Sequence, residues 1–174
     1  MSPARRIATA AVTAVLLGAT PGLATAATPQ AALPSQLTGE WHQFKIYPLN
    51  IPARNLDVDS AGRAVVAVVD PESARQQWSL SNIGGLPLIE NRATGTCLTA
   101  PDDTLDAVTV RACDRNNPNQ RWDVHYVTAG QVAISPKAHP RLALTGGTQA
   151  GSNTALLRIY AAQDNQQWSM RSVK

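Results

Sequence analysis

Hydrophobic and polar residues alternate in a pattern that recurs three times along the chain. The recurring words are Gln76-Gln77-Trp78, Gln120-Arg121-Trp122 and Gln166-Gln167-Trp168. Their tryptophans are separated by 44 and 46 positions, and each is followed two positions later by an apolar residue: Leu80, Val124 and Met170. A period of two is typical of a half-buried strand, so each tryptophan is expected to begin a strand or to lie within one.

The repeat continues upstream of each tryptophan. A leucine followed by a polar residue recurs as Leu56-Asp57, Leu98-Thr99 and Leu144-Thr145. The polar residue precedes the glutamine of the following Gln-x-Trp word by 19, 21 and 21 positions, respectively. Another strand-like stretch lies between these two words in every unit, at residues 65–69, 108–110 and 157–160. Glycines at 84–85 and at 130 mark hairpins between the units, and further apolar stretches follow them.

Each unit of roughly 44 residues therefore holds about four short strands, without helical periodicity. Three units make about twelve strands, whose edges must be closed or covered. A closed threefold arrangement that brings one tryptophan per unit to a common core meets this requirement. A three-bladed propeller is the alternative, but propellers generally have at least about four blades. The pattern predicts an all-β fold, a β-trefoil of three Gln-x-Trp repeats.

The first 26 residues have the features of a cleaved signal peptide. Arg5 and Arg6 precede an apolar stretch of about 11 residues, which is short of the roughly 20 that span a bilayer. Small residues at Ala24 and Ala26 suit signal peptidase. We therefore expect residues 1–26 to be removed, residues 27–39 to form a flexible lead-in, and residues 40–174 to form one domain. The mature protein is expected to be secreted and to have no membrane contact.

Signal cleavage also changes the charge of the chain. The full sequence has 15 basic and 12 acidic residues and a formal net charge of +3, and the loss of Arg5 and Arg6 leaves a net charge of about +1. No cluster of basic residues with interleaved aromatic residues occurs, so nucleic-acid binding is not expected. The only two cysteines, Cys97 and Cys113, are expected to pair because an exported chain meets oxidising conditions.

These motifs resemble the ricin-B, or R-type lectin, family of β-trefoils over about residues 40–174. The resemblance rests on the three Gln-x-Trp words, the aligned Leu-Asp/Thr words and the cysteine pair of the middle unit. In the family, two cysteines of one repeat are bridged across the sugar-site region, and Cys97 and Cys113 match those positions. Asn55 and Ala143 stand at the first of these positions in the outer units, and no residue is expected to replace the second.

The resemblance implies up to three shallow sugar pockets, one per repeat. In the family, an aspartate accepts hydrogen bonds from two sugar hydroxyls, and an aromatic ring stacks on the apolar face of the sugar. An asparagine just before the Gln-x-Trp word adds a polar contact. The residues that this pattern makes candidates for carbohydrate binding are Tyr160, Asn165, Thr145, Asp57 and Asn119.

The first two units each carry part of this set. The first unit keeps Asp57 but has Arg75 where the asparagine belongs, and it has no aromatic residue at the ring position. The middle unit keeps Asn119, with Thr99 in place of the aspartate and Arg111 in place of the ring. Galactose binding of the family's usual kind is therefore not implied for either unit.

The third unit keeps Asn165 and has Thr145 in place of the aspartate. Tyr160 fits the ring position if the turn that follows it is two residues shorter than in the other units. On this alignment the third pocket ranks first as a sugar site and the first pocket ranks second.

Structural roles are the alternative for several of these residues. The Gln-x-Trp words are expected to fill the core and to hold backbone groups through Gln76, Trp78, Gln120, Trp122, Gln166 and Trp168. Asp57 is either a sugar acceptor or a carboxylate that stabilises a turn. Tyr160 is either a stacking platform or an ordinary strand tyrosine, and turn-capping is favoured for Thr99 and Thr145.

No metal or cofactor is expected. Oxygen ligands at Asp102, Asp103 and Asp106 suit calcium, but the EF-hand spacing is absent and a solvated loop is favoured. The three histidines do not have metal-ligand spacing, and neither a catalytic-triad motif nor a phosphate loop occurs. We therefore expect a protein that is not an enzyme.

The leading hypothesis is a secreted, monomeric module that binds sugars of a glycan or polysaccharide without catalysis. The alternative is a secreted β-trefoil that binds a protein, for example as a protease inhibitor, because a fold alone does not determine function. The polar loops 114–119 and 163–166 are the surfaces expected to serve that alternative.

Overall fold

The computed structural model describes residues 43–81, 85–102, 106–147 and 152–173. The expected signal peptide (1–26) and lead-in (27–39) lie outside the described residues. Within the described ranges the chain forms twelve β-strands and three short 3-10 helices. None of the helices in these ranges is long and apolar enough to span a membrane.

Each repeat contributes four strands in the same order. The first unit contains β1 (Gln43–Pro48), β2 (Arg54–Val58), β3 (Ala64–Val68) and β4 (Trp78–Ser81). The second contains β5 (Leu88–Asn91), β6 (Cys97–Thr99), β7 (Thr109–Arg111) and β8 (Trp122–Thr128). The third contains β9 (Gln131–Pro136), β10 (Leu142–Thr145), β11 (Leu156–Ile159) and β12 (Trp168–Ser172). A 3-10 helix ends two residues before each tryptophan: η2 (Ala74–Gln76), η3 (Pro118–Gln120) and η4 (Asp164–Gln166).

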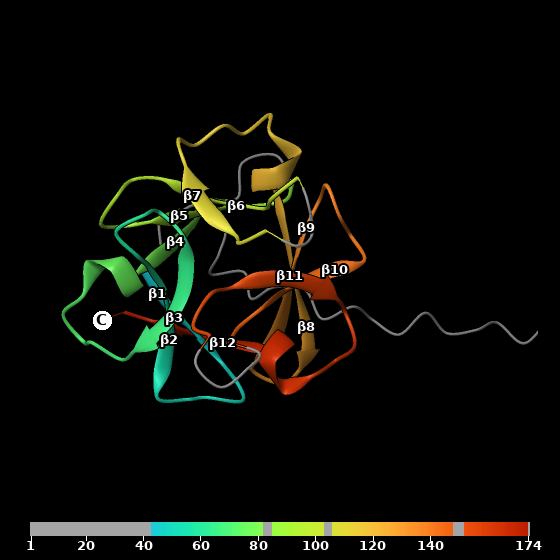
Figure 1. Ribbon diagram of the computed structural model, residues 1–174. Coiled ribbons are helices and arrows are strands. Elements are labelled where there is room, and N and C mark those ends of the chain that lie inside the picture. The colour runs from blue at the N-terminus through green and yellow to red at the C-terminus, as the bar shows by residue number, and fades with distance from the viewer. Residues whose placement is uncertain (1–42, 82–84, 103–105, 148–151, 174) are drawn as a thin grey trace, which may run out of the picture. The chain divides into compact units, whose positions relative to one another are not determined.

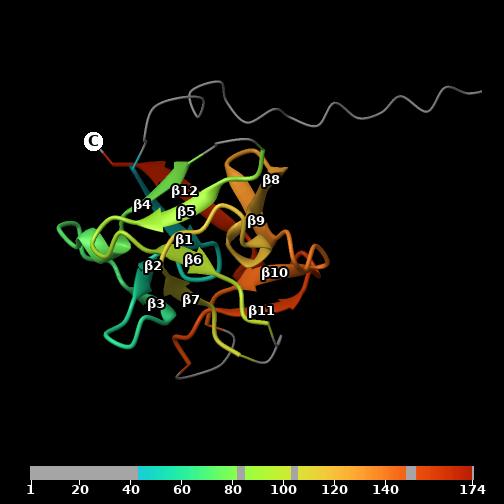
Figure 2. The same ribbon diagram turned by 90° about the horizontal axis from the view of Figure 1, so that it is seen from above.

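The first and fourth strands of the units form an antiparallel barrel. Strand β1 pairs with β4 and β12, β12 pairs with β9, β9 pairs with β8, and β4 pairs with β5. The N–H of Trp122 donates to the carbonyl of Pro87 at 3.0 Å, which links the start of β8 to the residue before β5. The second and third strands of each unit form a hairpin, and Figure 1 shows the three hairpins in separate sectors of the view. Figure 2 shows them gathered at one end of the barrel.

A ring of backbone hydrogen bonds joins the three hairpins. The N–H of Ala64 donates to the carbonyl of Val108 at 2.8 Å, Val108 donates to Ala155 at 3.0 Å, and Ala155 donates back to Ala64 at 2.8 Å. All three residues are fully buried. One residue from each repeat therefore lies at the centre of an approximate threefold arrangement, as the expected β-trefoil requires.

The three tryptophans are the largest fully buried side chains of the core. Each indole N–H donates to the carbonyl of the leucine in the upstream Leu-Asp/Thr word of its own unit. The distances are 3.0 Å from Trp78 to Leu56, 2.9 Å from Trp122 to Leu98 and 2.9 Å from Trp168 to Leu144. Each tryptophan thus packs in the core without leaving its polar atom unsatisfied.

The turn between β2 and β3 is stabilised by one carboxylate. Asp59 accepts hydrogen bonds from the N–H groups of Ala61 and Arg63, each at 2.9 Å, and pairs with the Arg63 guanidinium at 2.7 Å. Desolvation raises the pKa of Asp59, but these hydrogen bonds outweigh it and hold the pKa below its usual value. Gly62 has a φ of 75°, which a glycine adopts at little cost.

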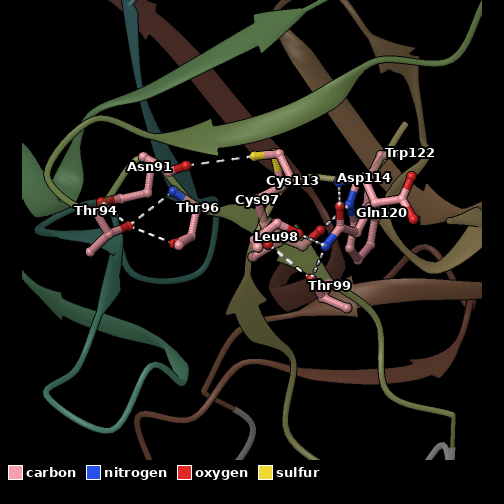
Figure 3. Close-up of a disulfide and its surroundings, with 12 residues drawn as sticks. Asn91, Thr94, Thr96, Cys97, Leu98, Thr99, Cys113, Asp114, Gln120 and Trp122 are labelled. Atoms are coloured by element: carbon pink, nitrogen blue, oxygen red, sulfur yellow. Dashed lines mark hydrogen bonds between the residues drawn. A yellow bond between two sulfur atoms is a disulfide. The ribbon is translucent and has the colours of Figure 1, made fainter. Parts of the chain in front are cut away.

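The expected disulfide is present. Cys97 in β6 is bonded to Cys113, which lies two residues beyond the end of β7, and the two cysteines are 16 positions apart in the sequence. Figure 3 shows the bond beside Gln120 and Thr99 of the same unit. The bridge holds the end of the middle hairpin against its first strand.

Replacing both cysteines by alanine (Cys97→Ala with Cys113→Ala) is expected to lower the free energy of unfolding by about 3 kcal/mol, because the unfolded chain loses a constraint over a loop of this length. Urea denaturation followed by tryptophan fluorescence measures this change. A reductant should destabilise the wild type by a similar amount and leave the variant unaffected. Equal midpoints for the oxidised wild type and the variant would contradict the expectation.

Candidate functional site

The glutamine of each Gln-x-Trp word is buried at the end of a 3-10 helix and holds the turn that follows the third strand of its unit. Its side-chain N–H donates to a backbone carbonyl, at 2.8 Å for Gln76 to Val68, 2.9 Å for Gln120 to Ala112 and 2.8 Å for Gln166 to Ile159. Its side-chain oxygen accepts a backbone N–H, at 2.9 Å from Asp70, 2.6 Å from Asp114 and 2.8 Å from Ala161. The glutamines thus hold backbone groups, as the sequence predicts.

The same glutamines contact the candidate sugar-binding position of each unit. The side-chain N–H donates to Asp57 at 2.9 Å in the first unit, to Thr99 at 3.0 Å in the second and to Thr145 at 3.4 Å in the third. Figure 3 shows the Gln120 amide between Thr99 and the backbone of Asp114. The side chain at this position is therefore oriented by a hydrogen bond from the buried glutamine amide of its own unit.

The two threonines at this position are buried and use their hydroxyl hydrogens within the fold. Thr99 donates to the carbonyl of Cys97 at 2.9 Å, and Thr145 donates to the carbonyl of Ala143 at 3.0 Å. Their exposed fractions are 4% and 1%. This placement favours the turn-capping interpretation over a direct sugar contact for both residues.

Asp57 is the carboxylate at this position, and it is partly exposed. One of its oxygens accepts the N–H of Val58 at 2.6 Å, and the other accepts the side-chain N–H of Gln76 at 2.9 Å. An ionised carboxylate offers about four acceptor sites, so these two bonds fix its orientation and leave capacity for a ligand. Its surroundings differ from the family pattern, because Arg75 remains at the asparagine position and Ala67 lies at the ring position.

The strand pairing corrects the predicted position of Tyr160. Cys97 pairs with Arg111 across β6 and β7, and Ala143 pairs with Arg158 across β10 and β11. The third-unit residue that corresponds to Arg111 at the ring position is therefore Arg158, and Tyr160 corresponds to Cys113. The prediction of a turn two residues shorter is wrong: the shortening is one residue, within a turn where Ala162 adopts a φ of 53°.

The same pairing shows that the second cysteine position is occupied in the outer units, contrary to the expectation that nothing replaces it. By the register of β2 and β3, Val69 takes this position in the first unit, and Tyr160 takes it in the third. The Tyr160 ring meets His125 of β8 edge-on, with ring centroids 6.1 Å apart. A sugar contact at Tyr160 stays a prediction, but one at a different place in the pocket.

The two asparagines before the Gln-x-Trp words accept an equivalent backbone hydrogen bond, and the Asn119 side chain has a partner of its own. The Asn119 side chain donates to the Asp102 carboxylate at 2.6 Å, and the backbone carbonyl of Asn119 accepts the N–H of Ala100 at 2.8 Å. Asn165 is partly buried, and its carbonyl accepts the N–H of Gly146 at 2.9 Å. Asp103 of the acidic cluster lies outside the described residues, and Asp102 is engaged with Asn119 rather than aimed at a shared centre.

One group of metal-type side chains occurs in the described part of the chain. Glu90, Cys97 and Cys113 have ligand atoms within 4.8 Å of one another. The two sulfur atoms are bonded to each other and offer no thiolate. This group is therefore unsuited to hold a metal ion in the oxidised protein.

A pocket that the sequence pattern does not predict lies on the flank of the first unit. It has a volume of about 310 Å³ and lies between the barrel strands β1 and β12 and the first hairpin. Its lining residues are Lys45, Tyr47, Pro52, Asn55, Val69, Arg171, Ser172 and Val173. The signal that could have found it is the loss of the cysteine pair in this unit, because Asn55 and Val69 stand at the two cysteine positions.

Replacing Gln166 with alanine is expected to lower the free energy of unfolding by about 1–3 kcal/mol, because backbone groups at Ile159 and Ala161 lose their partner. The exposed Gln163, whose side chain does not cap η4, is the control. Gln163→Ala should change the stability by less than about 0.5 kcal/mol. Thermal and urea denaturation compare the two, and equal effects would show that the buried amide does not hold this turn.

A family described as ricin-type β-trefoil lectin domain-like matches residues 74–160, which is half of the chain. The search of curated protein sequences gave no significant match. Many solved structures match, including a Clostridium perfringens endo-β-galactosidase that releases GlcNAcα1-4Gal, at 13% identity and a TM-score of 0.66 over 76% of this chain.

Two further structures are similar. An exo-β-1,3-galactanase from Clostridium thermocellum matches at 25% identity and a TM-score of 0.66 over 77% of this chain. A Polyporus squamosus lectin, solved with the epitope Neu5Acα2-6Galβ1-4GlcNAc, matches at 14% identity and a TM-score of 0.64 over 78% of this chain. The match covers 33% of the endo-β-galactosidase, 31% of the galactanase and 50% of the lectin. From the matched residues, the three repeats and the hairpin geometry, the chain belongs to the family of ricin-type β-trefoil lectin domains.

Proposed function

We propose that the protein is a secreted module that binds the sugars of a glycan or polysaccharide without catalysis. The observation that carries the proposal is the fixed and partly exposed carboxylate of Asp57. Its carboxylate is held by Gln76 and by the N–H of Val58, it is partly exposed, and it retains acceptor capacity. Adjacent hydroxyls of a sugar suit such an acceptor because one carboxylate can accept two hydrogen bonds.

The fixed orientation of Asp57 favours binding. A side chain that is already held in place loses little conformational freedom when a ligand arrives, so more of the hydrogen-bond energy appears as affinity. The aspartate of the first unit therefore replaces Tyr160 as the leading candidate. Tyr160 lies at the second cysteine position and contacts His125, and Thr145 is buried.

The similar proteins support binding rather than chemistry. The Polyporus squamosus lectin is solved with a sialylated oligosaccharide, and the two glycosidases are proteins about three times as long as the part that this chain matches. The match covers only about a third of each glycosidase, so the activity of those proteins is not carried over to this chain and we propose no catalytic role for it. Export is supported by the signal-peptide pattern of residues 1–26 and by the Cys97–Cys113 bond, which suits an oxidising compartment.

A glycan and polysaccharide array, probed with the disulfide-bonded protein, tests this proposal. The wild type is expected to bind at least one class of sugar, and Asp57→Asn is expected to weaken that binding about tenfold or more, because a charged acceptor is lost. Asp164→Asn removes an exposed carboxylate of the third unit and is the matched control. It should bind as the wild type does.

Other outcomes of the array are equally decisive. Loss of binding in Tyr160→Ala, with Asp57→Asn unaffected, would move the site to the third unit. Failure of the folded wild type to bind any sugar would reject the carbohydrate proposal.

One observation favours a second candidate function, the inhibition of a protease that cleaves after arginine. Arg115 is exposed in the loop 114–119 beside the disulfide. The Arg115 carbonyl accepts a hydrogen bond from Arg121 at 3.0 Å, and the Asp114 side chain accepts the N–H of Asn116 at 2.8 Å. An arginine on a loop held in this way could occupy a protease's specificity pocket without rapid cleavage.

Titration of trypsin with the protein tests this second candidate. Inhibition at a ratio near one to one, abolished by Arg115→Ala and kept by Lys137→Ala, is the expected result if the loop is inhibitory. Rapid cleavage after Arg115 without inhibition would reject it.

A further inference from the structure

We infer that the flank pocket of the first unit binds the acidic group, a carboxylate or a sulfate, of a sugar residue in an acidic glycan. The inference rests on the proposed carbohydrate binding and adds a second site with its own ligand chemistry. Lys45 and Arg171 supply positive charge to this pocket, and its volume of about 310 Å³ is large enough for one sugar unit.

The two cations face the pocket from directly opposed positions. Lys45 in β1 pairs with Arg171 in β12, so their side chains leave the same face of neighbouring strands. Like charges placed in this way repel each other. Neither side chain forms an ion pair with a carboxylate within the described part of the chain. An anion between them would relieve the repulsion.

Both cations are held by neighbouring groups. The Lys45 ammonium donates to the carbonyls of Pro71 at 2.8 Å and Asp70 at 3.2 Å, and it retains a third proton for a ligand. The Arg171 guanidinium lies over the Tyr47 ring, 4.7 Å from its centroid. Stacking on the ring leaves the edge of the guanidinium, which carries the N–H donors, available to an acid group.

In this unit the two cysteine positions hold an unlinked pair, Asn55 and Val69, and both residues line the hollow. In the second unit the equivalent positions are filled by the disulfide. In the third unit Tyr160 fills the place of Val69 and packs against His125. His125 and Arg171 are equivalent, since each lies three residues after a Gln-x-Trp tryptophan on a strand that flanks a hairpin.

The wall of the pocket is fixed by a buried amide. Asn55 takes the first cysteine position, is 3% exposed, and donates to the side-chain oxygen of Gln76 at 2.9 Å. The side-chain N–H of the same glutamine donates to Asp57, but Asp57 is not among the residues that line the pocket. The flank pocket is therefore separate from the Asp57 site and carries the opposite charge, so the two sites select different groups of a glycan.

Isothermal titration of the disulfide-bonded protein with two matched pairs of probes tests the inference. The first pair is trigalacturonate and its fully methyl-esterified form, and the second is a sulfated dextran oligosaccharide and the unsulfated one. We expect the wild type to bind one acidic probe and to bind its neutral partner about tenfold more weakly or not at all. The pair that shows this difference identifies carboxylate or sulfate as the ligand group.

Variants separate the pocket from general attraction between charges. Arg171→Gln should raise the dissociation constant for the acidic probe about tenfold or more. Lys45→Met should act in the same direction, with folding checked by circular dichroism. The control is Lys137→Gln with Arg141→Gln, which removes one lysine and one arginine that are exposed in the third unit, outside the pocket. An equal loss of affinity in the control and in Arg171→Gln would overturn the inference.

Failure of the inference is distinguishable from failure of the proposed function. Acidic binding that survives in Asp57→Asn supports a separate flank site, even if neutral sugars do not bind at all. Neutral-sugar binding with no preference for either acidic probe overturns the inference and leaves the proposed function standing. Loss of acidic binding in Asp57→Asn, with Arg171→Gln unaffected, places the ligand at Asp57 and also overturns it.

Discussion

The fold depends on the hydrogen bonds that two buried side chains make in every repeat. The glutamine of each Gln-x-Trp word holds both the end of a hairpin and the residue at the candidate sugar position, and the tryptophan holds the backbone of the preceding leucine. A buried amide or indole without such partners would be costly. Because these bonds recur at 2.6–3.4 Å in all three units, the same local geometry persists where the surrounding sequence differs.

Because the buried glutamines and tryptophans hold the fold, the residues around the candidate pockets can differ between the units without changing it. Each glutamine bonds to backbone groups of the turn and also donates to the side chain at the candidate sugar position, where a threonine hydroxyl can accept as an aspartate carboxylate does. Thr99 and Thr145 each keep one bond to the glutamine and turn their own hydrogen inward. The cysteine positions show the same freedom, with a disulfide in one unit, an asparagine and a valine in another, and an alanine and a tyrosine in the third. Each combination gives the unit a differently shaped surface, and the strands and hairpin of the unit stay the same.

The features predicted correctly from the sequence are those set by repeated local patterns. The spacing of the tryptophans predicted twelve strands, three repeats and the trefoil, because alternation and repeat length depend on residues close in the sequence. The pairing of Cys97 with Cys113 followed from there being only two cysteines. Strand boundaries were displaced by about one residue, as at β3 and β11.

The errors arose where the prediction required residues distant in the sequence to be placed together. Turn length alone does not place Tyr160, and the pairing of Ala143 with Arg158 shows that the turn is one residue shorter, not two. The lost cysteine pair marks the first unit as different, but it does not reveal the cations of the flank pocket, because Lys45 and Arg171 are more than a hundred positions apart and meet only when the first and last strands pair.

The ring formed by Ala64, Val108 and Ala155 has a consequence for how the chain reaches its folded state. Each member donates to the next repeat and accepts from the other, so no repeat can complete its own bonds until both others are in place. A fragment of one or two repeats would leave buried backbone groups unpaired, which disfavours partly folded states. Folding is therefore expected to be cooperative over the whole trefoil, and slow, because the ring closes only through contacts between residues far apart in the chain.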